Sequence, residues 1–241
     1  MPDLTAFYVT DRDAWNAFVE RAPHRSFPQL WEWGELREPS GWRAVRFGVG
    51  EREGEPLAGA QVLIRTVPLL GWRLGYAPRG PIGQLDAPET RRSLLAAFRH
   101  LGVMEGIATL KVDPEATSDD PLGAALLAPP WRTAAKVQPP RTRIVDLSLD
   151  EDALIAALRQ KHRQYVHKAE RDGVLVEQID PNADGNIDPN ADGNVALADF
   201  YRIYRHTAER AGFVVRVPDY YERVWRLFAP GGHGRLFFAS L

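Results

Sequence analysis

The stretch RAVRFGVGEREGEPLAGAQVLIRTV, residues 43–67, carries the clearest strand pattern of the chain. Apolar and small residues predominate in 43–49 and 57–67, and the Glu-Gly-Glu at 53–55 has the composition of a turn. In the second segment, one alternating set of positions is Leu57, Gly59, Gln61 and Leu63, and the other is Ala58, Ala60, Val62 and Ile64. The stretch therefore predicts two strands joined by a turn.

Strands and helices alternate on both sides of this pair. Before it, the sequence predicts a strand at 5–10, a helix with Thr10 as its N-cap, and a loop with aromatic residues at 26–42. After it, a helix is predicted at 89–101 and a strand at 107–113, which stops at an Asp-Pro pair. This order is typical of a domain that combines a sheet with helices.

A cluster of prolines at 129–140 marks a candidate boundary between two domains. Beyond it, the sequence predicts a strand at 142–147 and a long helix that opens on the capping box at 148–151 and closes at Gly173. The elements predicted after this helix are a strand at 174–178, helices near 196–211 and 218–229, a turn at Gly231-Gly232 and a final strand at 235–241.

Two consecutive halves that each mix strands and helices indicate an α/β (α+β) fold with domains at 1–141 and 142–241. The final strand, RLFFASL, is apolar, and no predicted element follows that could pair with it or cover it. Because a completed domain seldom ends in this way, we expect the second half to be truncated and the chain to have low catalytic activity. An exposed apolar edge of this kind also favours aggregation.

Composition argues against several classes of protein. The chain has 241 residues, of which 44% are hydrophobic and 26% charged, which is ordinary for a folded protein. A net charge of -2 argues against a main task of binding duplex nucleic acid, but it is compatible with a local basic cleft. The absence of cysteine excludes a disulfide scaffold and a cysteine nucleophile. The N-terminus lacks a signal-peptide pattern and no apolar run is long enough to cross a bilayer, so we expect a cytoplasmic protein.

A tandem repeat, IDPNADGN-IDPNADGN, occupies residues 179–194. Its second copy matches the first six positions of an EF-hand loop, whereas the twelfth position is Asp where Glu is usual. The candidate Ca²⁺ ligands are Asp188, Asn190, Asp192 and Asp199. Because Asp is a poorer bidentate ligand here and no helix is predicted before the loop, a polar surface loop is the favoured interpretation.

Familiar catalytic motifs are absent from the sequence. No G-x-S-x-G, H-E-x-x-H or Walker A pattern occurs, which argues against serine hydrolases, zinc peptidases and P-loop enzymes. The Arg-Gly-Pro-Ile-Gly at 79–83 is close to the pyrophosphate-binding loop of CoA-dependent GNAT N-acyltransferases. However, Gln84-Leu85 breaks that pattern and Pro81 removes an N–H, so a CoA site has weak support.

Positively charged side chains recur beside aromatic residues. Arg37 follows two tryptophans, and Arg79 lies between two prolines that restrict the backbone. The other candidates for substrate binding are Lys161 and Arg163 on the basic helix, and Arg210, Arg216 and Tyr220 near the C-terminal helices. Guanidinium groups bind phosphate and aromatic rings can cover sugar or base rings, so together these residues would suit a diphosphate-and-sugar cleft.

Seven collinear motifs resemble the Fem-type aminoacyltransferases of peptidoglycan bridge formation. The motifs are FPQLWEWGELRE…GWR at 27–43, GYAPRGPIG at 75–83, LKVDPE at 110–115, VQPPRTRIVDLS at 137–148, LRQKHRQYVHKAERDGV at 158–174, FYRIYRHTAERAGFVVR at 200–216 and DYYERVWRLFA at 219–229. They follow the family's order along nearly the whole chain, which makes the resemblance specific.

The resemblance implies two GNAT-like subdomains side by side, with no cofactor. It implies transfer of an amino acid from aminoacyl-tRNA to an amine of a UDP-MurNAc-pentapeptide or of a lipid-linked peptidoglycan precursor. The reaction is aminolysis of an activated ester, in which the amine loses a proton and a tetrahedral oxyanion must be stabilised. We expect a monomer with no integral membrane segment.

The resemblance also implies roles for individual residues. Asp113 matches the family's carboxylate near the acceptor amine, which it would orient or deprotonate; capping of the turn after the strand is an equally good interpretation. Arg37 takes the place of the family's cleft cation, usually Lys, and Arg210 that of an arginine facing the diphosphate, so both are expected to line one cleft. Lys161 and Arg163 occupy the family's K-x-R position.

The sequence departs from the family pattern in two respects. Family chains continue well beyond residue 241, and the tandem repeat at 179–194 is not a family feature. Two alternatives therefore stay open, namely a CoA-dependent GNAT-type N-acyltransferase and a non-catalytic fragment or calcium-binding module.

Overall fold

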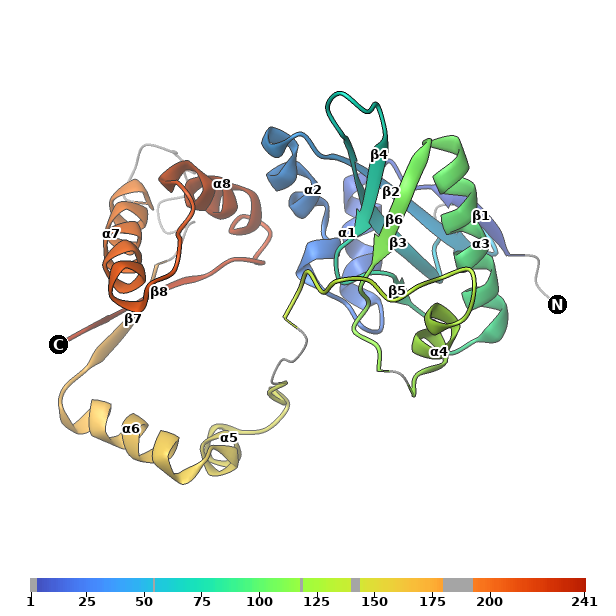
Figure 1. The fold of residues 1–241 in the computed structure, drawn as a ribbon. Coiled ribbons are helices and arrows are strands. Elements are labelled where there is room, and N and C mark those ends of the chain that lie inside the picture. The colour runs from blue at the N-terminus through green and yellow to red at the C-terminus, as the bar shows by residue number, and fades with distance from the viewer. Residues whose placement is uncertain (1–3, 54, 118, 140–143, 180–192) are drawn as a thin grey trace. The chain divides into compact units, whose positions relative to one another are not determined.

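The structure is a computed structural model in which the chain divides into two compact units, Met1–Pro140 and Arg141–Leu241. Each unit mixes helices and strands, so the predicted α/β (α+β) fold class is confirmed (Figure 1). The residues that the structure describes are 4–53, 55–117, 119–139, 144–179 and 193–241.

Unit 1, Met1–Pro140, is built around a six-stranded sheet with the order β1-β2-β3-β4-β6, in which β5 also pairs with β3. The strands are β1 Thr5–Tyr8, β2 Arg43–Gly50, β3 Ala58–Thr66, β4 Arg73–Ala77, β5 Ile82–Gly83 and β6 Ile107–Val112. β2 and β3 pair antiparallel, as the stretch 43–67 predicts, whereas β4 and β6 run parallel. The connection between β4 and β6 contains a long helix, as a parallel pair requires.

Helices cover both faces of this sheet. The helices of unit 1 are α1 Arg12–Arg21, α2 Trp31–Arg37, α3 Pro88–Met104 and α4 Pro121–Leu127. On β3, Val62 belongs to one buried cluster with Leu94 and Phe98 of α3. The neighbouring Gln61 instead donates to Leu30 O, just before α2, at 2.9 Å. Because successive side chains of a strand point to opposite faces, α3 and α2 lie on opposite sides of the sheet (Figure 1).

The predicted loop at 26–42 is wrong, because this segment contains α2 between two short 3-10 helices, Phe27–Gln29 and Glu38–Ser40. Gly34 inside α2 lowers the helix propensity of the segment. A Cβ at residue 34 would lie 2.5 Å from Nη2 of Arg46, so the close approach of that guanidinium explains the glycine.

Both predicted N-caps lie too early in the sequence. Asp11, rather than Thr10, caps α1, and its Oδ1 accepts a helix N–H at 2.7 Å. Asp150, rather than Ser148, caps the first helix after the domain boundary, and its Oδ1 accepts a helix N–H at 2.8 Å. Asp and Ser are both good N-cap residues, so composition alone could not choose between neighbouring positions.

Unit 2, Arg141–Leu241, consists of helices and a two-stranded antiparallel sheet. Its elements are α5 Glu151–Ala157, α6 Gln160–Arg171, β7 Leu175–Ile179, α7 Gly193–Ala211, α8 Pro218–Phe228 and β8 Leu236–Ser240. In the sheet, Leu175 of β7 lies opposite Ser240 of β8, and Ile179 lies opposite Leu236. The expectation that the final strand has nothing to pair with is therefore wrong.

The long helix predicted from 148 to 173 is two helices, α5 and α6. The helical backbone stops at Leu158, where ψ is 150°. Nη1 of Arg163 donates to Ala156 O at 3.0 Å and also to Leu158 O, so one side chain satisfies carbonyls at the end of α5. Gly173 follows α6 with a φ of +82°, as the prediction of a glycine C-cap requires.

The strand predicted at 142–147 is not present in its described part, 144–147. Ile144 and Leu147 are exposed there, and these positions have no ladder pairing. Apolar and β-branched residues favour a strand only where a neighbouring strand offers backbone partners, and the sequence could not show whether one does.

Candidate active site

The carboxyl ends of β4 and β6 bring two of the sequence motifs together. Ala77, at the end of β4, pairs with Val112, at the end of the parallel strand β6. Arg79 and Asp113 follow these strand ends closely, so the topology places them side by side. Polar groups beyond the carboxyl ends of neighbouring parallel strands are a common location for a binding or active site.

Asp113 is held by two short hydrogen bonds. Tyr76 OH donates to Oδ2 at 2.7 Å, and the backbone N–H of Arg79 donates to Oδ1 at 2.7 Å. A carboxylate has about four acceptor positions, so both oxygens keep capacity for a further donor. The side chain is half-buried. Asp113 is therefore fixed in orientation and can still accept a hydrogen bond from a bound amine.

The hydroxyl of Tyr76 is a hydrogen-bond donor to Asp113 that is itself held in place by a second hydrogen bond. Its hydroxyl accepts a hydrogen bond from Gln138 Nε2 at 3.2 Å while donating to Asp113. Burial, and then the hydrogen bond to Asp113, raise the pKa of Tyr76 well above its ordinary value. The hydroxyl therefore keeps its proton at neutral pH, and the hydrogen bonds run in one direction from Gln138 through Tyr76 to Asp113.

We expect Tyr76→Phe to change how stability depends on pH. Because the pKa of Tyr76 is higher in the folded state, the unfolded state loses this proton first, from about pH 10 upward, and wild-type stability falls as pH rises through that range. Tyr76→Phe should lose stability less steeply there. Urea unfolding between about pH 9 and pH 11 measures both slopes, and Tyr8→Phe, at an exposed position, is the control. Equal slopes for wild type and Tyr76→Phe would contradict the role of this hydroxyl.

Arg79 adopts a backbone conformation that is uncommon for a residue with a side chain, with a φ of +52°. Its N–H bond to Asp113 holds this conformation in place. Its guanidinium donates from Nη2 to Pro139 O at 3.1 Å, and its Nε lies 3.7 Å from a Glu115 carboxylate oxygen. Arg79 is thus part of the same network as Asp113, through both its backbone and its side chain.

The turn after β4 offers few free N–H groups to a pyrophosphate. Arg79 donates its N–H to Asp113, and Gly80 and Gly83 donate theirs to backbone carbonyls at 3.3 Å and 3.1 Å. Pro81 has no N–H. Because a phosphate-binding loop needs N–H groups that point at the ligand, this turn does not fit the CoA-binding loop considered from the sequence.

A buried glutamine fixes the turn that carries Arg79. Gln29 is fully buried, and its Nε2 donates to Pro78 O at 2.7 Å while its Oε1 accepts Gln61 N at 2.7 Å. A Cβ at Gly80 would lie 2.6 Å from the same Nε2, so glycine is required for this approach. Sequence reasoning did not single out Gln29, although a polar residue inside the apolar FPQLW was a signal.

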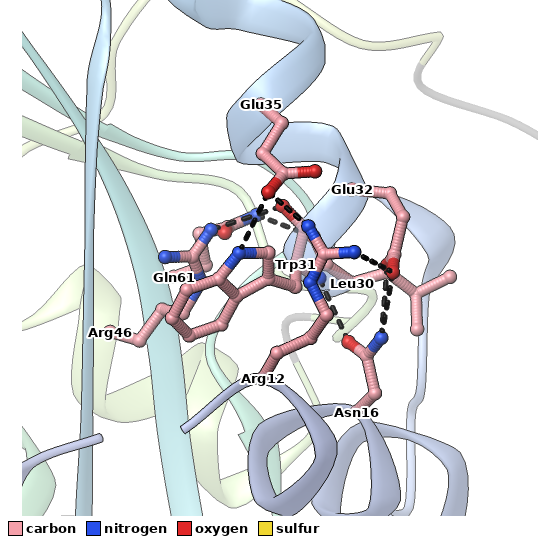
Figure 2. Close-up of polar contacts among 8 residues, drawn as sticks. All are labelled: Arg12, Asn16, Leu30, Trp31, Glu32, Glu35, Arg46 and Gln61. Carbon is pink, nitrogen blue, oxygen red and sulfur yellow. Dashed lines mark hydrogen bonds and ion pairs between the residues drawn. The ribbon is translucent and has the colours of Figure 1, made fainter. Parts of the chain in front are cut away.

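A network of polar side chains joins α1 to α2 (Figure 2). Oδ1 of Asn16 accepts the N–H of Trp31 at 2.9 Å, and its Nδ2 donates to both carboxylate oxygens of Glu32 at 3.0 Å. Arg12 lies 3.9 Å from Glu32 and also pairs with Glu35. Asn16 therefore satisfies one of the N–H groups that the start of a helix leaves unpaired.

Arg46 of β2 fixes α2 from the sheet side. Its guanidinium lies 3.4 Å from the centroid of the Trp31 ring, and Nη2 donates to Trp31 O at 3.0 Å. Burial lowers the pKa of Arg46 to about 10, and the carboxylates of Glu35 and Glu32 oppose this effect, so the group stays charged at neutral pH. Arg37, the last residue of α2, is half-buried and is carried by a helix that is fixed on two sides.

The two candidates on α6 of unit 2 differ in their surroundings. Lys161 is exposed, and its Nζ lies 5.5 Å from the centroid of the Tyr165 ring. Arg163 is half-buried and bonds the carbonyls at the end of α5. Arg163 thus has a local structural role that the sequence did not predict.

The C-terminal candidates lie on or beside an aromatic cluster between α7 and α8. The rings of this cluster are Phe200, Tyr201, Tyr204, Phe213, Tyr220 and Tyr221. The guanidinium of Arg216 lies 4.8 Å from the centroid of the Tyr220 ring. Arg210, in the last turn of α7, is exposed. Arg37 lies in unit 1 and Arg210 in unit 2, and the prediction that they line one cleft stays a prediction.

Most of the candidate calcium site lies outside the described residues. This is true of Asp188, Asn190 and Asp192, together with the rest of the repeat from 180 to 192. Asp199 is described on α7, where its Oδ1 accepts from Nη2 of Arg202 at 3.0 Å. Within the described part of the chain, no group of three or more His, Asp or Glu residues could hold a metal ion. The calcium site therefore stays a prediction.

The sequence profile of the FemAB family matches residues 10–121 and again residues 120–241. The chain belongs to the FemAB family. The resemblance inferred from the seven motifs is thereby confirmed, and the profile matches once in each half, as a tandem arrangement would require.

Two relatives are similar along nearly the whole chain. Lipid II:glycine glycyltransferase of Staphylococcus aureus is 28% identical over 99% of this chain, and the same protein from strain USA300 gives the same match. The crystal structure of FemX matches with a TM-score of 0.80 and 26% identity over 98% of this chain. The matched regions cover 55% of the glycyltransferase and 58% of FemX, so the chain spans about half the length of these relatives.

Proposed function

We propose that this FemAB family member is an aminoacyltransferase that moves an amino acid from aminoacyl-tRNA to the stem peptide of a peptidoglycan precursor. The observation that carries the proposal is the family match along both halves, with 28% identity to a glycyltransferase named for lipid II and glycine. The proposal names the class of reaction and does not specify glycine as the amino acid that is transferred. Because aminoacyl-tRNA is made in the cytoplasm, we propose that location.

Asp113 is the residue that we propose at the acceptor amine. An ammonium group must lose a proton before it attacks the ester carbonyl, and a carboxylate can orient the amine and accept that proton. The amine nitrogen adds to the ester carbonyl to give the tetrahedral oxyanion, which then collapses as the C–O bond breaks, and the ribose oxygen leaves with a proton as a hydroxyl. Tyr76 and Arg79 support this role because they hold the carboxylate in one orientation before the substrate binds.

We propose that Arg37 and Arg210 bind the diphosphate of the precursor, and that Lys161, Arg216 and Tyr220 make further substrate contacts. The guanidinium groups of Arg79 and Arg163 bond backbone carbonyls. For these two arginines we propose a positioning role beside the substrate.

Arg37→Ala and Arg210→Ala should each weaken binding of UDP-MurNAc-pentapeptide by about 10- to 100-fold. A charge-assisted hydrogen bond contributes roughly 1.5–3 kcal/mol, which corresponds to that loss. Calorimetry of the precursor against each variant measures the effect, and Arg99→Ala, at an exposed position of α3, is the control. Unchanged affinity in both alanine variants would remove these residues from the proposed site.

The competing CoA-dependent acyltransferase is disfavoured by the hydrogen bonds of the turn after β4, which use the N–H groups that a pyrophosphate would need. Calorimetry with acetyl-CoA distinguishes the two enzymes. We expect no binding at concentrations that saturate the chain with the peptidoglycan precursor. Micromolar binding of acetyl-CoA would instead support the acyltransferase.

A further inference from the structure

The turn between β3 and β4 presents large apolar side chains to solvent. Leu69 is 106% exposed, Leu70 is 58% exposed and Trp72 is 59% exposed. Figure 1 shows this connection projecting beyond the end of the sheet in unit 1. A contiguous exposed apolar patch on a folded protein marks an interaction site, whereas single exposed apolar side chains are ordinary.

The backbone of this turn is ordered by its own hydrogen bonds. Val67 N donates to Trp72 O at 2.7 Å, and Gly71 N donates to Val67 O at 3.2 Å. Leu69 has a φ of +70°, a region that disfavours any residue with a side chain. Leu69 therefore combines an uncommon backbone conformation with a side chain that is fully exposed to solvent.

The C-terminal end of α3 carries two further exposed apolar side chains. Val103 and Met104 are both exposed there. Nη1 of Arg73 donates to Glu105 O at 2.8 Å, which places this end of the helix beside the turn. We call the set of Leu69, Leu70, Trp72, Val103 and Met104 the apolar tip.

Positive charge surrounds a hollow at the base of the apolar tip. The hollow has a volume of about 380 Å³, and Arg43, Arg65 and Arg73 are among its lining residues. Glu105 pairs with Arg43 and lies 3.7 Å from Arg73, so this carboxylate offsets part of the charge of two of the three arginines. The base of the tip therefore carries an excess of positive charge, although the whole chain has a net charge of -2.

We propose that the apolar tip docks on the surface of an anionic phospholipid bilayer, with the three arginines binding lipid phosphates. Trp and Leu side chains partition to the level of the headgroups, and guanidinium groups bind phosphate through two hydrogen bonds. The arginines and the apolar tip lie at the same end of unit 1. Positive charge beside exposed apolar side chains complements the surface of an anionic bilayer. None of the helices in the described residues is long and apolar enough to cross a bilayer.

Membrane docking goes beyond the proposed reaction and does not depend on it. If both hold, docking brings unit 1 to the surface where a lipid-linked acceptor is found. Vesicle binding is measured without the transfer reaction, so loss of vesicle binding would leave the transferase proposal intact, and an inactive transferase could still bind vesicles.

Cosedimentation of the full chain with vesicles tests the docking proposal. Vesicles of phosphatidylcholine alone are compared with vesicles of phosphatidylcholine and phosphatidylglycerol in equal parts. We expect the affinity of the wild type for the anionic vesicles to exceed its affinity for the neutral vesicles by about tenfold or more. The reason is that each arginine near the surface contributes about fivefold in affinity. Arg65→Gln should reduce this preference and leave the weak binding to neutral vesicles unchanged.

Two leucines of equal exposure provide a matched pair. Leu70→Ser on the tip should lower vesicle binding about tenfold, whereas Leu127→Ser at the end of α4, which is 59% exposed, should not change it. Leu69→Gly should also lower binding, and it relieves the strained backbone, so its melting temperature should not fall. Loss of binding in that variant cannot be attributed to unfolding.

Three results would overturn the proposal. The first is a wild type that binds neither kind of vesicle. The second is equal binding by Leu70→Ser and Leu127→Ser. The third is self-association of the wild type in light scattering that Leu70→Ser abolishes, because the apolar tip would then be an interface between two copies of the chain.

Discussion

Asp113→Asn is expected to lower the rate of aminoacyl transfer by about 100- to 10,000-fold while leaving the protein folded. The amide has the same shape as the carboxylate but carries no negative charge and cannot accept the proton of the acceptor amine. It can still accept one of the two hydrogen bonds that Tyr76 and Arg79 donate to Asp113. The loss should therefore appear in the rate constant for transfer rather than in thermal stability.

Glu115→Gln is the matched control for Asp113→Asn. Glu115 is a carboxylate two positions along the chain, and its Oε1 lies 3.7 Å from Nε of Arg79. It bonds neither Tyr76 nor the backbone of Arg79 in the network described above, so its removal should cost less than tenfold in rate. Single-turnover transfer measured by mass spectrometry, with circular dichroism to check folding, gives the comparison. A near wild-type rate for Asp113→Asn would assign this residue to turn capping instead.

Gln29→Met is expected to destabilise unit 1 by about 2–6 kcal/mol, because each buried polar group left unpaired costs roughly 1–3 kcal/mol. Methionine has similar volume but leaves Gln61 N–H and Pro78 C=O without their side-chain partner. Gln84→Met, at an exposed position, should change stability by less than about 0.5 kcal/mol.

Tryptophan fluorescence during urea unfolding can measure the effect of Gln29→Met on unit 1. Six of the seven tryptophans lie in unit 1, and only Trp225 lies in unit 2, so the signal reports mainly on the unit that contains Gln29. Equal unfolding midpoints for Gln29→Met and Gln84→Met would show that the buried hydrogen bonds do not hold this unit together.

Local sequence patterns predicted the elements with regular periodicity. The strands at 43–67 and the helix that begins near residue 89 follow from alternation and from apolar spacing, which depend only on neighbouring residues. The helix α2 did not follow, because Gly34 lowers its propensity and its stability comes from Asn16 and Arg46 on other elements. The break between α5 and α6 was missed for a similar reason, since a side chain from the next helix stabilises it.

The candidate active site was predicted in part. Asp113 and Arg79 were identified through motifs, and the parallel pairing of β4 and β6 places them together. Tyr76, Gln138 and Gln29 were not singled out, because their partners lie 37 to 62 positions away along the chain. A single sequence contains no direct sign of such contacts, whereas the fold determines them.

The most direct test of the proposed function is transfer itself. The chain is incubated with a mixed pool of aminoacyl-tRNA and with either UDP-MurNAc-pentapeptide or lipid II. The mass of the precursor is then measured by mass spectrometry. The proposed reaction predicts a gain of one amino acid residue on the stem peptide, which disappears when the tRNA is digested beforehand or when Asp113→Asn replaces the wild type. A precursor of unchanged mass with every aminoacyl-tRNA, or one that gains an acetyl group from acetyl-CoA instead, would contradict it.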